Sequence, residues 1–193
     1  MKKSFTLIET IVVIAVIGLT LPVLFALIFT LMRQQIKIYR LSQVKKEGDY
    51  LLSTMGNTIR DNAMTIHQAN PPSDANIVCN DLVTSPIYPT GGGTIGNLYF
   101  LDTNNNLFGY RLTGTKIASD SASPTVHSVD LTSSKIVVYD FSIACAKNAD
   151  YSPPYVSISF NICYQTTSAN CVTSRPEEKA SIHYQTRIKL RNY

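Results

Sequence analysis

The sequence predicts an α+β fold in which one long N-terminal helix packs on a C-terminal antiparallel β-sheet. The first part of the chain carries a continuous apolar run, followed by apolar residues at three- and four-residue spacing, which is typical of a helix. The later part carries segments of alternating apolar and polar residues between turn residues, which is typical of strands. A helix followed by strands is the α+β order. We expect residues 5–32 to form the apolar half of the helix, 33–69 its amphipathic half and 70–193 the sheet domain.

The apolar run from Phe5 to Met32 contains one ionisable side chain, that of Glu9. As a helix, its roughly 28 residues would be about 42 Å long, enough to cross a hydrocarbon layer of about 30 Å. A secretory signal peptide would have a shorter apolar region, followed by a small-residue cleavage site. A plain transmembrane anchor explains the length of the run but not Glu9. A carboxylate in such a stretch is costly and by default indicates a function.

Two residues inside the run are expected to weaken the helix. Pro22 removes a helical hydrogen bond and should kink or locally melt the helix. Gly18, four residues earlier, adds to this weakness because glycine is a poor helix former. We expect a flexible point that lets the helix adapt between a bilayer and a protein assembly.

Residues Lys2 to Glu9 read KKSFTLIE. This segment resembles the class III signal of type IV pilin-like proteins, which has a short basic leader, a small residue at the cleavage point, then Phe-Thr-Leu-Ile-Glu and an apolar helix. The resemblance covers residues 1–32 and implies a pilin-like fold, with the apolar half of the helix in a membrane or in the core of a filament.

The resemblance implies roles for Ser4, Phe5 and Glu9. Residues 1–4 would be the leader, with Ser4 its last residue, and Phe5 would become the N-methylated N-terminus after cleavage by prepilin peptidase. The family usually has Gly where this chain has Ser4, so cleavage is expected to be slower. A buried carboxylate needs a cationic partner. The resemblance implies that Glu9 pairs with the amine of a neighbouring subunit's Phe5, which would fix the axial register. The alternative is that Glu9 reaches the cytoplasmic interface of the membrane.

The amphipathic half of the helix is expected to present one apolar face to the sheet domain. The residues of this face are Leu41, Val44, Leu52, Met55, Ile59, Ala63 and Ile66, with Gly48 filling one step. The segment Asn70–Asp74, which contains two prolines, would end the helix.

Basic residues follow the apolar run, and they are a candidate patch for DNA or for lipid headgroups. They are Arg33, Lys37, Arg40, Lys45 and Lys46. Lys2 and Lys3 favour a cytoplasmic N-terminus, whereas these five residues would argue for the reverse orientation. The signal-like motif and the cysteines place the sheet domain outside. The net charge of +4 is mild and does not by itself indicate nucleic acid.

Residues 71–97 are expected to form a loop, with one short strand over Ile77–Cys79. The glycines Gly91, Gly93 and Gly96 formally match a dinucleotide-binding pattern, but no strand-to-helix unit surrounds them. The expected strands are Leu98–Asp102, Leu107–Leu112, Val126–Leu131, Ser134–Cys145, Tyr155–Tyr164 and Lys179–Leu190. The segment Thr103–Asn106 should form a hairpin turn between the first two.

All four cysteines follow the apolar run, and an even number in an exported domain indicates two disulfides with three connectivities. We favour Cys163–Cys171, which closes a short loop, together with Cys79–Cys145. Buried free thiols are the alternative. No Cys-x-x-Cys pair or ligand-spaced histidine accompanies the cysteines, so we expect no metal site.

We expect no enzyme and no cofactor, because the sequence contains no catalytic motif. The histidines His67, His127 and His183 are dispersed, with His67 expected near the helix end and His183 facing outward on a strand. The pair Glu177-Glu178 lies in a polar stretch and is expected to be solvated.

The function expected from the resemblance is that of a structural subunit of a type IV filament system. The C-terminal segment Tyr184–Asn192 resembles the final strand of minor pseudopilins of the J type and related minor pilins, and Ile59–Ala63 resembles part of their helix. These echoes favour a minor pilin or pseudopilin that initiates or caps a filament. They leave open whether the system serves a pilus, type II secretion or competence.

The partners implied are other subunits through the helix, prepilin peptidase and the inner-membrane assembly platform. The location implied is the bacterial inner membrane, crossed once with the sheet domain outside, and then a filament. Two alternatives remain: a filament subunit whose outer domain binds DNA, a surface or secreted cargo, and an anchored binding domain unrelated to filaments.

Overall fold

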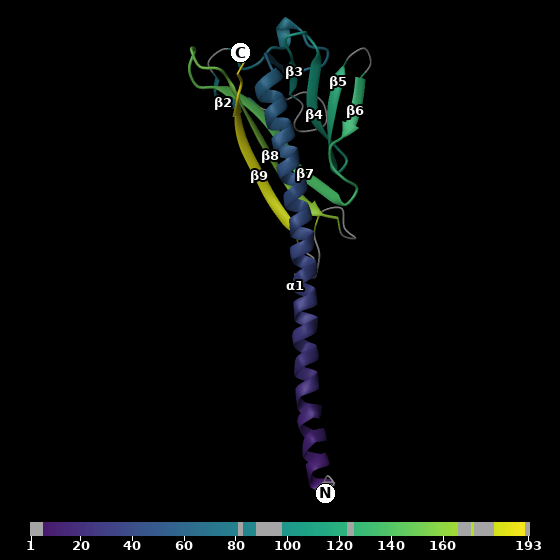
Figure 1. Cartoon of the computed structure of the whole chain (residues 1–193). Helices are drawn as coiled ribbons and strands as arrows, with labels where there is room; N and C mark the ends of the chain where they lie inside the picture. The colour runs from purple at the N-terminus through teal and green to yellow at the C-terminus, as the bar shows by residue number, and fades with distance from the viewer. Residues whose placement is uncertain are drawn as a thin grey trace.

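The computed structural model describes residues 6–80, 83–87, 98–122, 126–165, 171 and 180–191. It confirms the predicted α+β fold: one long N-terminal helix packs on antiparallel sheets. Figure 1 shows the upper part of this helix lying across a sheet, while its lower part extends away from every other element.

The long helix α1 spans Leu7–Asn62. Thr6 precedes it in an extended conformation, and its carbonyl oxygen accepts hydrogen bonds from the N–H groups of Glu9 and Thr10. The local melting expected at Pro22 is wrong for this structure, because Pro22 lies inside a continuous helix. A proline removes one hydrogen bond of the ladder, and the turns on either side keep theirs. Figure 1 draws this region without a sharp bend. The flexibility assigned to Gly18 and Pro22 stays a prediction.

The helix ends seven residues before the predicted boundary at residue 69. Strand β1, Thr65–His67, begins shortly after Asn62 and pairs with β3, Tyr99–Leu101, so that Ile66 lies opposite Phe100. Ile66 therefore reaches the core as a strand residue rather than as the last residue of a helical face. Its β-branched side chain suits a pleated surface, and the pairing with a distant strand overrides the local helical pattern.

The strands form two antiparallel sheets, whereas the sequence predicted a single one. The five-stranded sheet has the order β1-β3-β4-β5-β6, where β4 is Leu107–Thr113, β5 is Lys116–Ala122 and β6 is Val126–Asp130. The four-stranded sheet has the order β2-β7-β8-β9, where β2 is Val83–Ile87, β7 is Ile136–Lys147, β8 is Tyr155–Tyr164 and β9 is Ser181–Lys189.

The strand predicted at Tyr155–Tyr164 has these bounds as β8, and the strands predicted from Leu98 onward otherwise reappear with shifted ends. The hairpin turn between β3 and β4 is confirmed. The Asp102 carboxylate accepts hydrogen bonds from the backbone of Asn104 and from the backbone and side chain of Asn106. The hydrogen bonds from Asn106 are the main reason that the pKa of Asp102 lies below its ordinary value. This local network explains why the Asn-rich segment turns the chain.

Two predictions for the region before β3 are wrong. A loop was expected over 71–97, yet this region contains the short 3-10 helix η1, Asp74–Asn76, and strand β2. The strand expected at Ile77–Cys79 is reduced to one isolated bridge between Ile77 and His67. Strand β5 was not predicted at all, because its serines and Asp120 hide the apolar alternation.

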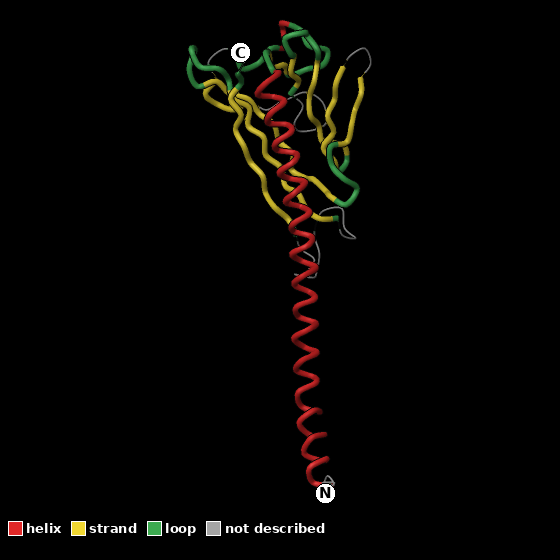
Figure 2. The backbone as a smooth tube through the Cα atoms, viewed as in Figure 1, coloured by secondary structure: helices red, strands yellow, loops and turns green. Residues whose placement is uncertain are grey.

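The core lies between α1 and the two sheets (Figure 2). The buried residues of the helix are Val44, Gly48, Leu51, Met55, Gly56 and Ile59. The predicted face is therefore partly wrong: Leu51 is buried, Leu52 is only partly so, and Leu41 is exposed. Steps of four and three residues from Val44 pass through Gly48 to Leu51, so the face turns with the helical repeat. On β8, Val156, Ile158, Phe160 and Ile162 are all buried, as the alternation predicted.

Candidate functional site

The first part of α1 is exposed in the described structure. Every residue from Thr6 to Tyr39 is exposed, although the segment consists mostly of Leu, Ile, Val and Phe. We call Leu7–Met32 the apolar half of α1 and Val44–Asn62 its docked half. A large apolar side chain left in water forgoes about 1.5–3 kcal/mol relative to burial. The apolar half therefore needs a nonaqueous environment, and by length and composition it could cross a membrane.

The threonine hydroxyls of the apolar half are hydrogen-bonded within the helix itself. The hydroxyl groups of Thr10, Thr20 and Thr30 donate to the carbonyl oxygens of Leu7, Ile17 and Ala26, at 2.8, 3.3 and 2.8 Å. Since a hydroxyl without a partner is costly in an apolar medium, these bonds make the segment compatible with lipid or with a packed bundle of helices.

Glu9 lies in the first turn of α1 and is exposed. A carboxylate is favoured there by the partial positive charge of the helix N-terminus. No cation among the described residues forms an ion pair with Glu9. The predicted cationic partner belongs to another molecule, and Ser4 and Phe5 lie outside the described residues. The structure thus leaves the Glu9 side chain available but does not place its partner.

The docked half is held by a contact that the sequence analysis did not find. Gly48 faces the ring of Tyr184 on β9 so closely that any β-carbon at position 48 would overlap it. The Tyr184 ring also stacks on Phe160, with ring centroids 5.4 Å apart. Its hydroxyl lies 3.1 Å from both the carbonyl oxygen of Lys45 and Oδ1 of Asp49, and donates a shared hydrogen bond to them. Glycine at position 48 therefore allows Tyr184 of the sheet domain to pack directly against the helix backbone.

The environment of Tyr184 raises its pKa to about 12, first through burial of the hydroxyl and then through Asp49. A neutral hydroxyl can donate to the Asp49 carboxylate, whereas a phenolate would repel it. The Tyr110 hydroxyl, which hydrogen-bonds Thr58 of the helix, also has a raised pKa because it is buried. Both tyrosines join the docked half to a sheet in their neutral form.

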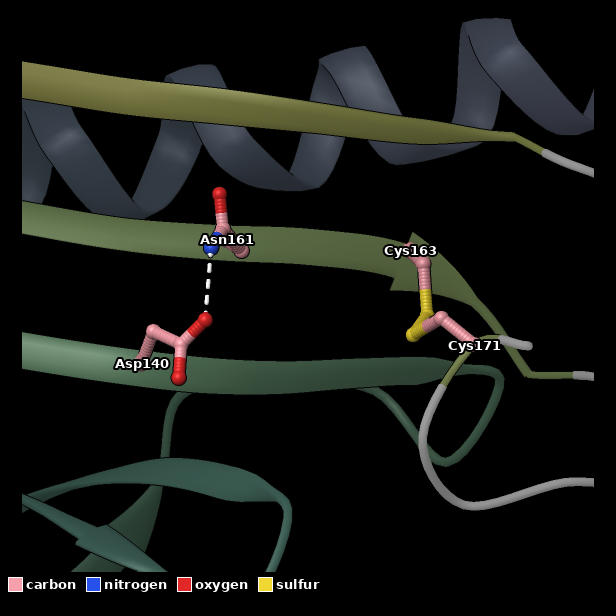
Figure 3. Close-up of a disulfide and its surroundings, with 4 residues drawn as sticks. All are labelled: Asp140, Asn161, Cys163 and Cys171. Carbon is pink, nitrogen blue, oxygen red and sulfur yellow. Dashed lines mark hydrogen bonds between the residues drawn. A yellow bond between two sulfur atoms is a disulfide. The ribbon is translucent and has the colours of Figure 1, made fainter.

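Two disulfides are present, with the pairing favoured from the sequence. Cys79 is joined to Cys145 on β7, and Cys163 on β8 is joined to Cys171. The first closes a separation of 66 residues and ties the chain after η1 to the four-stranded sheet. The second closes a separation of 8 residues at the end of β8 (Figure 3). Neither leaves a free thiol among the described residues.

The histidines have structural surroundings. His67 was expected near a helix end, but it is buried on β1. Its Nδ1 lies 2.8 Å from Oδ1 of Asn76, so Nδ1 carries the proton, and its Nε2 accepts from the Thr65 hydroxyl at 2.9 Å. The side chain of His127 lies outside the described part of the structure. Within the described part, no group of three or more His, Cys, Asp or Glu residues could hold a metal ion.

A polar row crosses the outer side of the four-stranded sheet. Asn161 Nδ2 donates to Asp140 at 2.9 Å (Figure 3), and its Oδ1 accepts from Nδ1 of His183 at 2.8 Å. His183 is exposed on β9, as predicted. The neutral amide of Asn161 separates the imidazole from the carboxylate, so this row joins three strands and does not form a relay between acid and base.

A shallow cleft of about 380 Å³ lies between α1 and the segment that follows β6. It is lined by Lys46, Glu47, Tyr50, Asp130, Leu131, Thr132 and Ser133. Asp130 is engaged by Lys116, whose Nζ lies 3.0 Å from Oδ2. The described lining contains no cysteine and no histidine.

The basic residues predicted as a patch do not share one face. Arg33, Lys37 and Arg40 are separated by four and three residues and lie on one side of α1. Lys45 and Lys46 follow at positions that point elsewhere. The side chain of Arg40 contacts the sheet domain, since its Cζ lies 5.6 Å from the centre of the Tyr164 ring.

Comparisons with family models, with curated proteins and with solved structures find no match to this chain.

Proposed function

We propose that this protein is a structural subunit of a type IV filament system, a minor pilin or minor pseudopilin. In this proposal prepilin peptidase removes residues 1–4, the apolar half of α1 anchors the protein in the bacterial inner membrane, and the sheet domain lies outside. The inner-membrane assembly platform then transfers the subunit into a filament, where it initiates or caps the assembly through α1.

One observation carries the proposal: the apolar half of α1 extends bare from a domain that is otherwise well packed. A helix that served only to complete the core of its own domain would bury this surface. A helix with two successive environments, lipid and then neighbouring helices, must keep it free. Both environments are apolar, and the internally bonded threonines suit both.

Glu9 supports a filament in preference to a plain anchor. A plain anchor does not require a carboxylate in its apolar segment, whereas a bundle of helices can use one charge to fix the axial position of each neighbour. The amine freed at Phe5 by cleavage would be a cation four residues away in sequence and, on a shifted neighbour, close in space.

The packing of the docked half of α1 on the sheets supports the proposal, because it couples the position of the sheet domain to that of the helix. The buried contacts from Val44 to Ile59 and the hydrogen bond of the Tyr184 hydroxyl join the helix to the sheets. A subunit that starts or caps a filament needs such a connection, because the outer domain must follow the position of the helix.

The test is the mature N-terminus of the full chain isolated from cells that contain prepilin peptidase. Mass spectrometry should find a chain that begins with N-methylated Phe5. Ser4→Gly should increase the mature fraction, because glycine is the usual residue at this point in the family that the signal resembles, and Ser4→Leu should abolish maturation. An intact residue 1–4 segment in the wild-type protein, in cells that process another pilin, would contradict the proposal.

A further inference from the structure

Three basic side chains continue the buried face of the helix below the sheet domain. Steps of three and four residues lead from Arg33 through Lys37 and Arg40 to Val44, the first buried residue of the docked half. We call Arg33, Lys37 and Arg40 the basic stripe. It begins one residue after Met32, where the apolar half ends. The stripe therefore lies under the sheet domain and directly above the apolar half.

The sheet domain holds one end of this stripe. The Arg40 guanidinium stacks on Tyr164 at the end of β8, with 5.6 Å between Cζ and the ring centre. Its Nη1 is enclosed and has no hydrogen-bond partner among the described residues. A guanidinium nitrogen without an acceptor forgoes hydrogen bonds that it would make in water, so an anionic acceptor close to Arg40 is favoured.

The described part of the chain does not neutralise the stripe. The ion pairs Arg111–Asp120 and Lys116–Asp130 both belong to the five-stranded sheet. Arg33 and Lys37 are exposed and have no carboxylate partner among the described residues. Three cations on one helix face then produce a local positive potential that attracts an anion.

We propose that the basic stripe binds the phosphate headgroup of an acidic phospholipid in the leaflet nearest the sheet domain. This inference rests on the membrane anchoring in the proposed function. Each interfacial layer of a bilayer is about 5–8 Å thick beyond a hydrocarbon core of about 30 Å. Arg33 to Arg40 covers about 10 Å of helix. With the apolar half in the hydrocarbon, Arg33 and Lys37 lie at headgroup depth, and the long side chain of Arg40 reaches down to it.

The position of the charges separates a lipid from a polyanion such as DNA. A polyanion bound to the outside of α1 would also use Lys45 and Lys46, which are exposed on other sides of the helix and farther from the apolar half. A headgroup can use only the residues next to the hydrocarbon. Lys45 and Lys46 therefore provide a control that removes the same charge as changing two residues of the stripe.

The experiment uses the full chain in vesicles with a single tryptophan as reporter, since the sequence contains none. Ile36→Trp places the reporter beside the stripe, and Ile38→Trp places it on another side of the helix. These isoleucines are 52% and 67% exposed, so neither change disturbs the core. Brominated phosphatidylglycerol or brominated phosphatidylcholine quenches the tryptophan according to which lipid is adjacent to it.

The Ile36→Trp protein should be quenched about threefold more effectively by brominated phosphatidylglycerol than by brominated phosphatidylcholine at low ionic strength. The Ile38→Trp protein should show less preference. Arg33→Gln with Lys37→Gln should bring the ratio at position 36 close to one, whereas Lys45→Gln with Lys46→Gln should leave it unchanged. Inorganic phosphate at millimolar concentration should not compete.

Equal quenching by both lipids at position 36, or an equal loss in the Lys45 and Lys46 control, would overturn the assignment. Competition by inorganic phosphate would show a general anion site instead of a lipid site. If the preference for brominated phosphatidylglycerol at position 36 appeared only at a high ratio of protein to lipid, the stripe would be assigned to contact with a second copy of the chain instead. Failure of the chain to resist carbonate extraction from the vesicles would refute anchoring itself, which distinguishes that outcome from loss of lipid preference alone.

Discussion

The apolar half and the docked half of α1 are parts of one unbroken helix, yet they differ in burial and in the distribution of apolar residues around the helix. The docked half has a narrow buried face, and each residue on it faces a particular partner, as Gly48 faces Tyr184. The apolar half is hydrophobic on all sides and is exposed throughout in the described part of the structure. A helix that is apolar all round is adapted to an apolar solvent, whereas an amphipathic helix is adapted to one surface. Substitutions should therefore affect folding in one half and assembly in the other.

The largest expected effect separates assembly from folding. Glu9→Gln keeps the size and polarity of the side chain but removes the charge that would pair with Phe5 of a neighbour. We expect at least about a tenfold loss of incorporation into filaments, because an unpaired amine in an apolar bundle costs several kcal/mol. Incorporation is measured as the sheared filament fraction relative to the membrane fraction.

Glu9→Asp is the matched control for this substitution, because it keeps the charge on a shorter side chain and should retain part of the incorporation. Urea denaturation of the full Glu9→Gln chain in micelles should be the same as that of the wild type. A Glu9→Gln protein that enters filaments at the normal level would remove the role assigned to Glu9.

Substitution of one leucine in each half of α1 tests whether only the docked half contributes to the stability of the sheet domain. Leu51 is 0% exposed in the docked half, and Leu24 is 54% exposed in the apolar half. Leu51→Ala should lower the free energy of unfolding by about 2–5 kcal/mol, because it removes a buried side chain and leaves a cavity. Leu24→Ala should leave the unfolding of the sheet domain unchanged. The measurement is urea denaturation in micelles followed by the near-ultraviolet circular dichroism of the tyrosines, and similar losses for both variants would contradict the division.

Gly48 and Gly18 allow the same substitution to be made in the docked half and in the apolar half of α1. Gly48→Ala places a methyl group in the ring of Tyr184, and the required shift should cost about 1–3 kcal/mol. Gly18→Ala meets nothing within 4 Å and should favour the helix by up to about 1 kcal/mol. Thermal denaturation of the sheet domain should therefore shift to lower temperature in Gly48→Ala and stay unchanged in Gly18→Ala, whose effect is confined to the apolar half. A neutral Gly48→Ala would mean that Tyr184 can leave the helix without cost.

The smallest expected effect concerns the hydroxyl of Tyr184. Tyr184→Phe keeps the ring stacking and removes the hydrogen bond to Lys45 and Asp49, at a cost of about 1 kcal/mol. The raised pKa means that the folded state holds this proton more tightly than the unfolded state, whose ordinary value is 10.0. Its contribution to stability is therefore complete below pH 10 and is lost as the pH rises toward about 12.

The pH profile separates the hydroxyl from the ring. Between pH 10 and 12 the wild type should lose more stability than Tyr184→Phe, as followed by urea denaturation at each pH. Tyr110, whose pKa is also raised, remains in both proteins and contributes equally to both profiles. Parallel profiles would show that the contact with Asp49 does not stabilise the docked half.

Local pattern determined much of the fold. The apolar run, the period of the helix and the alternation in Tyr155–Tyr164 predicted α1 and the long strands, because these features depend on residues close in sequence. The same holds for the turn at Asp102, whose bonds are all local. The exposure of Glu9 and the apolar half also follows from composition, since a sheet domain of this size cannot cover so long a helix.

The tertiary structure alone decided the features that depend on distant contacts. Ile66 became a strand residue because Phe100 lies opposite it, and β5 formed from a polar segment because β4 and β6 flank it. The contact of Tyr184 with Gly48 joins residues 136 positions apart in sequence. The sequence near Gly48 shows only a glycine on a helical face and does not reveal its partner. The basic stripe is visible as a spacing in the sequence. Only the packing of Val44 shows that this side of α1 lies under the sheet domain, because the buried face of a helix is set by what packs on it.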